Sequence, residues 1–395
     1  MLNIQEYLNY TSESESPESY HTWVYLSMIS AIVGKKAWVK FNYFNVYPNM
    51  YIALVSLPGV GKKSTAIRIG RQLVAESKSR VKIVADNITR EALIEEMENS
   101  KFVFEVSPTT KYISSPVTAL ASELVTLLAG GPTMVEFLTD IYDSDKQWKY
   151  KTKTKGENTI INPCLNIISG VTTDIFCSRI IKDAVSGGFI SRSVIVYDQN
   201  IKVSSPFNLP NADQLNSMQK VIRRFSELES LYGEITFTPK AKEIFETWYF
   251  QQRTAMNVST QLEFHSRKHI HVVKCAMLLA LSELKLLISE LEINAAIELI
   301  SRIEYNMKFI YMSAGNSKYS EVYLKLLNAV NITGSIEYSE LLKFFMRDMD
   351  HEEFEKLISM MERLKYLKRV IHTNPKREVV EITDSGKAVF NQYTG

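Results

Sequence analysis

Residues 53–67 read ALVSLPGVGKKSTAI, a segment in which a glycine turn separates two regular patterns. The apolar run of residues 50–55 suits a buried strand, and the residues from Lys63 to about Glu76 have the pattern of a helix. A strand, a glycine turn and a helix in this order direct backbone N–H groups and a helix N-terminus toward one point, where they can bind phosphate. We therefore predict an ATP-binding loop made of Pro58, Gly59, Val60, Gly61, Lys62, Lys63, Ser64 and Thr65.

The spacing of this loop leaves two registers open. The common phosphate-binding pattern is G-x-x-x-x-G-K-[ST], in which the lysine binds the phosphates and the hydroxyl binds Mg²⁺. With Lys62 as that lysine, Ser56 and Gly61 take the glycine positions, but Lys63 stands where the hydroxyl belongs. With Lys63 instead, Ser64 supplies the hydroxyl, but both glycines are displaced by one residue. A loop that is longer by one residue reconciles the registers, and a plain glycine turn before a helix is the alternative.

Strand-like and helix-like segments alternate along the chain. Apolar runs near residues 81–84, 102–106, 117–123, 164–170 and 193–197 suit strands, and the alternation with helices predicts an α/β sheet. From residue 212 the pattern is largely helical, and after a boundary near residue 317 three helices precede a β-hairpin, as in a winged helix. The predicted segments are an N-terminal helical lead-in (1–47), an α/β core (48–205), a helical lid (206–316) and a winged-helix domain (317–395).

Composition excludes several classes of protein. The 395 residues are 45% hydrophobic and 23% charged, which suits a globular chain of two or three domains. A formal net charge of +2 is too small to indicate nucleic-acid binding by itself. The 3 cysteines are widely spaced, which argues against a disulfide framework and for a reducing, cytoplasmic location. Apolar stretches are shorter than the roughly 20 residues that span a bilayer, so we expect no membrane partner.

Five segments carry a resemblance to a known family: PESYHTWVYLSMISAIVGKKAWV, YIALVSLPGVGKKSTA, NPCLNIISGVTTD, GGFISRSVIVYD and FTPKAKEIFETWY. They resemble phage- and plasmid-encoded primase-helicase-type ATPases, in which a basic residue and then lysine follow Pro-Gly-x-Gly. The likeness covers most of residues 16–313. It implies a P-loop NTPase core of the AAA+ type that takes ATP and Mg²⁺, with Lys63 and Ser64 in the working register and Lys62 as a second phosphate contact. Ser56 at the first glycine position and the extra loop residue depart from the family pattern and bear on the hydrolysis rate.

The apolar pattern VTALASE at residues 117–123 ends in an acid, as expected for the carboxylate that activates an attacking water. We therefore predict Glu123 as the catalytic base, with Asp140 and Asp143 as alternatives. A surface glutamate after a strand is the plain interpretation. Ser122 stands where many ATPases place a magnesium-binding aspartate.

Two further catalytic elements follow in the sequence. The strand that ends in ISGVTTD places Thr172 or Thr173 near the expected γ-phosphate, where a hydroxyl orients water, and either residue also suits a helix cap.

The segment GGFISR resembles the arginine-finger position of minichromosome-maintenance-type and other AAA+ helicases. This implies that Arg192 contacts a neighbouring subunit's nucleotide; without the resemblance, Arg192 is an ordinary salt-bridge residue. Arg267 and Lys274 resemble the lid helix whose basic residue senses nucleotide, so Arg267 is assigned to ATP binding.

Residues 146–161 have the pattern of a β-hairpin, with a turn signal at the KGEN sequence. Lysines interleaved with aromatic side chains can follow a phosphate backbone and stack on bases, so we predict that single-stranded DNA binds here in a central channel; a solvated charged face is the alternative. The candidate residues are Lys146, Trp148, Lys149, Lys151, Lys153 and Lys155. In the C-terminal domain, Lys376 and Arg377 add charge to the wing, while the acidic start of the preceding helix opposes phosphate binding. This domain therefore binds DNA through its wing or binds a replication protein.

The leading interpretation is an ATP-dependent DNA helicase or translocase of a phage or mobile genetic element, a homo-oligomeric, hexameric ring that acts in DNA replication. A nucleotide-gated replication initiator or helicase loader with slow hydrolysis is the second interpretation, favoured by the unusual loop and the winged helix. An ATPase of host defence or regulation that needs no nucleic acid is the third. DNA-stimulated hydrolysis with strand displacement indicates the first, DNA binding without unwinding the second, and no effect of DNA the third.

Overall fold

The computed structural model divides into two compact units, Met1–Ile310 and Tyr311–Gly395. The three segments that were predicted before residue 317 therefore lie mainly within one unit. The structure describes residues 3–84, 86–107, 109–143, 146–152, 156–180, 188–198, 200, 202–205, 207–255, 262–314, 320–346, 349–363, 365–373 and 376–387.

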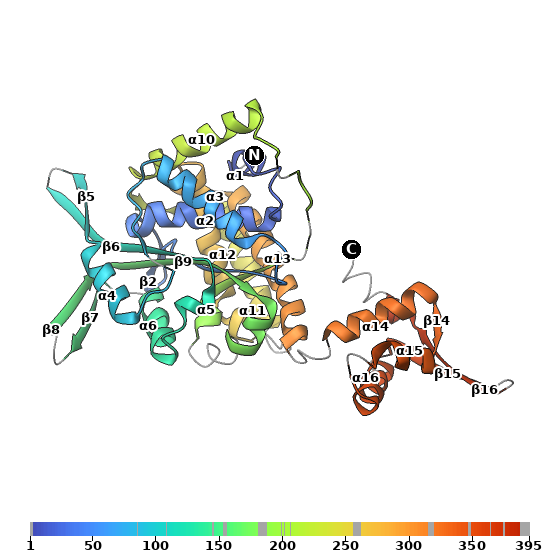
Figure 1. Ribbon diagram of the computed structural model, residues 1–395. Coiled ribbons are helices and arrows are strands. Elements are labelled where there is room, and N and C mark those ends of the chain that lie inside the picture. Colours follow the sequence, from blue (N-terminus) through green and yellow to red (C-terminus); the bar gives the residue numbers. More distant parts are fainter. Residues whose placement is uncertain are drawn as a thin grey trace. The chain divides into compact units, whose positions relative to one another are not determined.

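The first unit is built on a twisted sheet of six strands in the order β10-β3-β9-β6-β4, with β5 paired to β6 (Figure 1). Five of them are parallel, and only β5 runs antiparallel to its neighbour. The strands are β3 (Tyr51–Ser56), β4 (Ile83–Val84), β5 (Phe102–Ser107), β6 (Thr110–Ala121), β9 (Pro163–Thr172) and β10 (Ser193–Tyr197). The predicted alternation of strands and helices is thus confirmed as a mixed α/β arrangement with a parallel sheet.

Helices cover both faces of this sheet; in Figure 1, α2, α3 and α10 lie above it and α4 and α6 below it. The helices of the unit are α1 (Ile4–Tyr10), α2 (Glu18–Val33), α3 (Lys63–Glu76), α4 (Arg90–Asn99), α5 (Leu124–Leu127), α6 (Pro132–Asp143), α7 (Thr173–Ile175), α9 (Phe189–Arg192), α10 (Ala212–Leu228), α11 (Pro239–Ala255), α12 (Leu262–Ser282) and α13 (Glu290–Ala314). A short π-helical turn, Phe176–Ile180, follows α7. Thr89 caps α4, because its hydroxyl accepts the N–H of Ala92 at 3.2 Å.

Helix α2 is the most deeply buried helix of the first unit. Every residue from Tyr20 to Val33 is buried, and the helix contacts α3, α12 and four strands of the main sheet, β3, β6, β9 and β10. A helix that is apolar all round belongs inside a core, since it has no polar face to offer to water. The segment predicted as a lead-in is therefore a central element of the unit.

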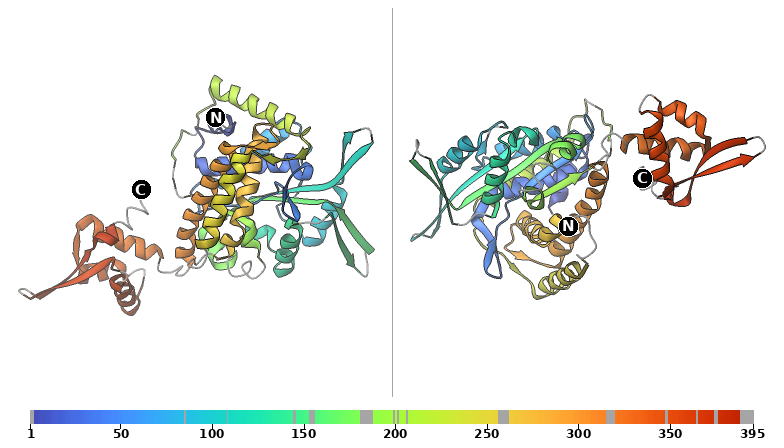
Figure 2. Two further views of the ribbon diagram at one scale, coloured as in Figure 1. Left: turned by 180° about the vertical axis from the view of Figure 1, so that it is seen from behind. Right: turned by 90° about the horizontal axis from the view of Figure 1, so that it is seen from below.

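Two β-hairpins extend from the same side of the first unit, as the views in Figure 2 agree. One joins β5 to the first half of β6, and the other joins β7 (Gln147–Thr152) to β8 (Gly156–Ile161). The predicted lysine hairpin is present, and Gly156 of the KGEN sequence already belongs to β8, where it pairs with Thr152 of β7. Because β9 begins two residues after β8, this second hairpin lies at the amino end of β9.

Smaller strand pairs complete the first unit. They are formed by β1 (Ala37–Phe41), β2 (Phe44–Val46), β11 (Gly233–Glu234), β12 (Thr236–Phe237) and β13 (Leu287–Ile288). Over the residues that the structure describes, no helix has the length and apolar character needed to cross a membrane.

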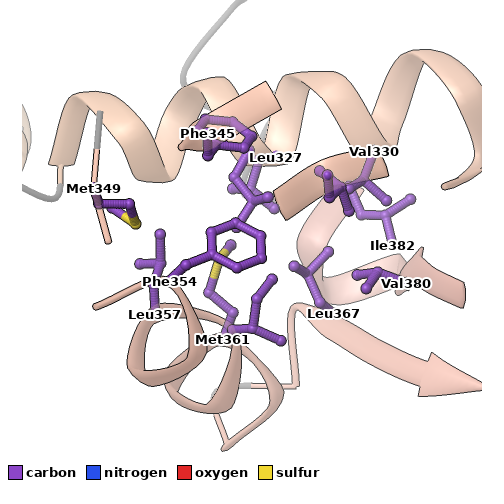
Figure 3. Packing of buried hydrophobic residues seen from close by; sticks show 13 residues of the cluster. Leu327, Val330, Phe345, Met349, Phe354, Leu357, Met361, Leu367, Val380 and Ile382 are labelled. Atoms are coloured by element: carbon purple, nitrogen blue, oxygen red, sulfur yellow. The ribbon is translucent and has the colours of Figure 1, made fainter. Parts of the chain in front are cut away.

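The second unit combines three helices with a three-stranded antiparallel sheet in the order β14-β16-β15. Its elements are α14 (Ser320–Thr333), β14 (Ser335–Glu337), α15 (Tyr338–Phe345), α16 (His351–Arg363), β15 (Leu367–Thr373) and β16 (Lys376–Ile382). Aliphatic side chains, methionines and two aromatic rings from all the helices and two of the strands form its core (Figure 3). Phe345 and Phe354 stack at its centre, with ring centroids 5.9 Å apart. The predicted order of three helices and a hairpin is present in the described part of this unit.

Candidate functional site

The loop between β3 and α3, here called the glycine loop (residues 57–62), has a backbone that requires glycine. Gly59 and Gly61 have φ values of 74° and 75°, in the left-handed region that disfavours larger residues. At Gly61, a Cβ atom would also lie 2.8 Å from a ring carbon of Tyr20 and 3.0 Å from the Ser56 hydroxyl. Tyr20 itself is fixed by a 2.6 Å hydrogen bond from its hydroxyl to the carbonyl oxygen of Val55. Through Tyr20, the buried helix α2 therefore leaves no space for a side chain at position 61 of the glycine loop.

The two adjacent lysines of the loop have different surroundings. Lys63 is the first residue of α3, and its ammonium donates a 2.7 Å hydrogen bond to the Ser56 hydroxyl across the loop. Burial lowers the pKa of the Lys63 ammonium. The Lys62 side chain is half exposed, and its ammonium lies 3.8 Å from Glu15 Oε2. Lys62 also has a left-handed backbone, with φ 45°, and its carbonyl oxygen accepts the Ser16 hydroxyl at 2.9 Å.

A pocket of about 300 Å³ opens beside this loop. Its walls come from the loop, the first turn of α3 and the segments that follow β6 and β9, so it lies at the carboxyl ends of parallel strands. That edge of an open α/β sheet is where ligands generally bind. The lining residues are Gly59, Val60, Lys62, Lys63, Ser64, Ser122, Glu123, Leu124, Val125, Gly170, Val171, Thr172 and Ile175.

Gly170 allows the lysine to reach the pocket. A Cβ atom at this position would lie 2.9 Å from the Ser122 carbonyl oxygen and 3.3 Å from Lys63 Cβ. The aliphatic stem of Lys63 therefore crosses β9 at the one point of close approach where that strand has no side chain. Sequence reasoning did not single out Gly170, although a glycine inside a strand often marks close backbone or side-chain approach.

Two of the four predicted catalytic residues, Glu123 and Thr172, line this pocket. Glu123 is exposed, with an extended backbone directly before α5, and lines the pocket together with Thr172 and Ser64. Thr173 is buried instead, and its hydroxyl has no hydrogen-bond partner among the described residues. Of the two threonines, Thr172 is thus the one that a ligand in the pocket could contact. Pro58 is exposed on the loop, and the Thr65 N–H donates to the Lys62 carbonyl oxygen at 3.0 Å.

One carboxylate near the pocket was missed by the sequence reasoning. Asp86 follows β4, the strand next to β6, and its Oδ2 accepts the Ser122 hydroxyl at 2.9 Å and the Ser122 N–H at 3.2 Å. The only sequence signal is an acid two residues after the short apolar run that ends at Val84. Hydroxyl and carboxylate oxygens at Ser64, Ser122 and Glu123 are the hard ligands that Mg²⁺ prefers, usually alongside phosphate oxygens and water. The pocket therefore offers side-chain oxygens of the kind that Mg²⁺ prefers.

The two predicted arginines meet elsewhere, on the carboxylate of Asp143. Arg192 donates to Asp143 Oδ2 at 2.7 Å, and Arg267 donates to both carboxylate oxygens at 2.8 and 2.9 Å. Burial alone would raise the pKa of Asp143, but the two guanidinium groups outweigh it and lower the pKa. Asp143 is thus a partner of arginines and not a member of the pocket beside the glycine loop. The other alternative base, Asp140, is exposed on α6.

These arginines lie at the opposite end of the sheet from the glycine loop. Ser193, which directly follows Arg192, pairs with Tyr51 at the amino end of β3, whereas the loop follows its carboxyl end. Six residues of strand span roughly 20 Å. The structure therefore does not bring Arg192 or Arg267 to the pocket of their own chain, and the assignment of Arg267 to that pocket is corrected. The cause is the packing of α12 against α9, which a local sequence pattern does not reveal.

A second cavity, of about 530 Å³, adjoins this arginine pair. Asp143, Arg267 and the buried Lys274 line it. The Lys274 ammonium donates to the backbone and side-chain oxygens of Asn49 at 2.8 and 2.9 Å and lies 3.8 Å from the ring centroid of Tyr142. Burial lowers the pKa of Lys274 to about 7, although the nearby Asp143 carboxylate opposes this shift.

The lysine hairpin has one packed face and one exposed face. Trp148 and Tyr150 stack with ring centroids 5.9 Å apart, Trp148 contacts Phe137 edge to face, and Arg90 donates to the Tyr150 hydroxyl at 2.6 Å. These contacts hold the two rings against α4 and α6. Rings that stack on bases would instead face away from the protein. Lys149 lies on the alternate face. Lys146, Lys149 and Lys151 are exposed, and Lys153 and Lys155 lie outside the described residues.

Three basic residues of the β15–β16 hairpin form ion pairs within the second unit. Arg369 contacts Glu355, Glu362 and Glu378 at 2.6, 3.2 and 3.2 Å. Arg377 is exposed, and its guanidinium lies 3.4 Å from Glu337. The Lys376 side chain lies outside the described part of the chain. These pairs reduce the positive potential that the β15–β16 hairpin could offer to a phosphate backbone.

No protein-family model and no curated protein matches this sequence. Within the described ranges, no group of three or more His, Cys, Asp or Glu side chains could hold a metal ion. The arrangement beside the glycine loop thus combines a cation, hydroxyl groups and one exposed carboxylate around a pocket at the carboxyl edge of a parallel sheet.

Proposed function

We propose that the chain is a P-loop NTPase of the AAA+ type that binds ATP with Mg²⁺ and acts as a DNA helicase or translocase in the replication of a phage or mobile genetic element. One observation carries the proposal: Lys63 and Ser64 begin α3 directly after the glycine loop and line one pocket with Glu123 and Thr172. These four residues come from three separate stretches of the sequence and meet only because β3, β6 and β9 are parallel neighbours.

Each residue has a role in this proposal. The loop N–H groups and the Lys63 ammonium bind the phosphates, and the Ser64 hydroxyl holds the cation, which when bound neutralises charge on the phosphate oxygens. The Glu123 carboxylate accepts the proton of the attacking water, and the Thr172 hydroxyl orients that water. Lowering of the Lys63 pKa by burial reflects a cation with little solvation, which an anionic ligand would stabilise.

The position of Arg192 supports a shared active site. Because Arg192 lies at the amino end of the sheet, a phosphate that it contacts belongs to another subunit. A head-to-tail assembly that places this end of one subunit against the glycine loop of the next closes into a ring, for which we propose a hexamer. In such an assembly, release of Arg192 from Asp143 accompanies its contact with the neighbour's nucleotide.

The lysine hairpin supports DNA as the partner. Lys149 and Lys151 are exposed on a β-hairpin that joins the amino end of β9, and β9 ends at Thr172 in the pocket. A strand of ten residues, roughly 30 Å long, would thus connect the DNA contact to the nucleotide site. The second unit, as a winged helix, is proposed to bind DNA through its hairpin or a replication protein through its acidic helix.

ATPase turnover measured with and without single-stranded DNA, together with the mass in solution with ATP, tests the proposal. We expect hydrolysis that DNA stimulates, strand displacement and a mass that ATP raises to that of a ring. Absence of nucleotide binding would overturn the assignment of the glycine loop. Hydrolysis that is indifferent to DNA would instead indicate an ATPase that acts without nucleic acid.

A second candidate function is a nucleotide-gated replication initiator or helicase loader. The hydrogen bond from the Lys63 ammonium to the Ser56 hydroxyl favours it. A glycine at position 56 would have no hydroxyl to accept this bond, and the ammonium would then be available to the phosphates alone. Competition for this ammonium slows phosphate binding and hydrolysis in this candidate. ATP-dependent DNA binding without strand displacement distinguishes it from a helicase.

A further inference from the structure

We propose that Ser122 and Asp86 act as a pair on the cation side of the pocket, where the Ser122 oxygen faces the magnesium ion and Asp86 positions it. The proposal deepens the ATPase assignment and rests on it. It concerns the position directly after β6, where Ser122 stands in place of the aspartate that many ATPases have there. The carboxylate that this position lacks is supplied from β4, the neighbouring strand.

The contacts between the two residues define one orientation. Asp86 Oδ2 accepts both the hydroxyl and the N–H of Ser122, at 2.9 and 3.2 Å, so the serine side chain is held in one rotamer. The Thr126 hydroxyl, which lies 2.7 Å from the Glu123 carbonyl oxygen and 3.3 Å from the Asp86 carbonyl oxygen, packs beside the pair. Ser122 lines the pocket with Lys63 and Ser64.

The chemistry of a hydroxyl explains what this orientation achieves. A serine hydroxyl has one proton and two lone pairs, and here the proton is given to Asp86. The lone pairs are therefore left for a cation or for one of its water ligands. The negative charge of Asp86 behind the oxygen strengthens it as a ligand, in the way that carboxylates behind metal ligands commonly do.

The backbone around Ser122 adds rigidity to the pair. Gly170 on β9 approaches the Ser122 carbonyl oxygen so closely that a Cβ atom there would lie 2.9 Å from it. Glu123 follows with an exposed side chain, which leaves it available for water activation. Two oxygen functions thus sit side by side at the end of β6, one directed by Asp86 toward the cation and one free to act on water.

The test is the Mg²⁺ dependence of nucleotide affinity, measured by calorimetry with a non-hydrolysable ATP analogue in Mg²⁺ and in EDTA. We expect the wild-type chain to bind more tightly in Mg²⁺. Asp86→Asn and Ser122→Ala should each reduce that gain about 10–100-fold while leaving the affinity in EDTA unchanged. The double variant Asp86→Asn with Ser122→Asp should recover it, because the carboxylate then stands at the end of β6 itself.

Controls separate this proposal from the ATPase assignment. Glu95→Gln removes an exposed carboxylate on α4 and should keep the full Mg²⁺ gain, and thermal unfolding of every variant checks the fold. A wild-type Mg²⁺ gain that both single variants retain would overturn the Ser122–Asp86 pair and leave the ATPase assignment in place. Absence of nucleotide binding by the folded wild-type chain would overturn both. A double variant that stays as weak as the single variants would contradict the carboxylate exchange.

Discussion

Lys62 and Lys63 are chemically identical neighbours whose surroundings give them different expected roles. Both line the pocket, but Lys63 begins α3 and its ammonium is directed across the loop to Ser56, whereas the half-exposed Lys62 ammonium lies 3.8 Å from Glu15. We predict that Lys63→Ala lowers ATP turnover by about 10²–10³-fold, the usual cost of one lost donor to a reacting oxygen. Lys62→Ala should keep partial activity. Matched turnover assays on both variants measure this, and the reverse ranking would restore the register in which Lys62 binds the phosphates.

Glu123 is expected to act on water and not on the bound nucleotide. We predict that Glu123→Gln binds ATP with unchanged affinity but lowers turnover about 10²–10⁴-fold, because a general base acts only in the transition state. Calorimetry with ATP and a phosphate-release assay on the same sample measure the two effects. Glu136→Gln, which removes an exposed acid of α6 by the same substitution, is the matched control. Full turnover by the glutamine variant would mean that another group activates the water.

Lys274 gives a prediction for pH, because its pKa is about 7 in the folded chain and near 10.4 in an unfolded one. Between these values the unfolded state binds more protons, so the contribution of Lys274 to stability rises with pH, by up to about 1.4 kcal/mol per pH unit. Below pH 7 both states are protonated and the contribution is constant. Urea unfolding measures this in the wild-type chain and in Lys274→Met. The free energy of unfolding of the wild-type chain, minus that of the variant, should increase from pH 7 to pH 9. A difference that stays constant over that interval contradicts the prediction.

The residues of the site differ in how far sequence alone could predict them. The positions of Glu123 and of the alternatives Thr172 and Thr173 were predictable because each stands at the end of an apolar strand, and parallel strands share one carboxyl edge; the choice of Thr172 over Thr173 came from the structure. Asp86 was not, since β4 has only two residues and its place beside β6 depends on strand order, which local patterns do not carry. Arg267 was assigned to the wrong end of the sheet because its position depends on how α12 packs.

At the scale of elements, the lysine hairpin and α2 show what local pattern conveys. The alternation of residues 147–161 predicted a hairpin correctly, but not that its aromatic face packs on α4 and α6. Helix α2 was predicted as a helix from its apolar spacing, but its role behind Gly61 follows only from the Tyr20 contact. Periodicity therefore predicts the element, and tertiary packing decides which face is used.

The exposed face of the hairpin leads to a prediction about DNA. If Lys149, Lys151 and Lys153 contact the backbone of a single strand, replacing all three by glutamine flattens the slope of log affinity against log salt by about 0.7 per lost contact. Basal ATPase should survive, because the hairpin joins the amino end of β9 and the pocket lies at its carboxyl end. Stimulation by DNA should be lost. Binding over a salt series and turnover with and without DNA measure these effects.

The control for the hairpin variant removes the same charge elsewhere. Replacing the exposed Lys220, Lys240 and Lys242 of α10 and α11 by glutamine should leave both the salt slope and DNA stimulation unchanged. An unchanged slope in the hairpin variant would make the hairpin a solvated surface and move the DNA path to Arg377 in the second unit.

At the scale of the whole molecule, the proposed active site is split between the two ends of one sheet. The glycine loop and Glu123 lie at the carboxyl edge, while Arg192 and Arg267 share Asp143 at the amino edge. Under the proposed function, one subunit contributes the glycine loop to one catalytic site and Arg192 to another, and a head-to-tail neighbour completes each site. The arginine pair on Asp143 keeps both guanidinium groups ordered in the single chain.

This separation predicts complementation between two inactive variants. Arg192→Ala should bind ATP normally and fail to hydrolyse it, and Lys63→Ala should fail through its own loop. In a ring mixed from equal amounts of both, about one interface in four joins the intact loop of an Arg192→Ala subunit to the intact arginine of a Lys63→Ala subunit, so activity should return in part. Turnover is measured across mixing ratios, with native mass spectrometry to verify mixed rings. Arg223→Ala, which removes an arginine from the exposed surface of α10, should stay active alone and serves as the control. Mixed rings that recover no activity at any ratio would mean that Arg192 does not act on a neighbour's nucleotide.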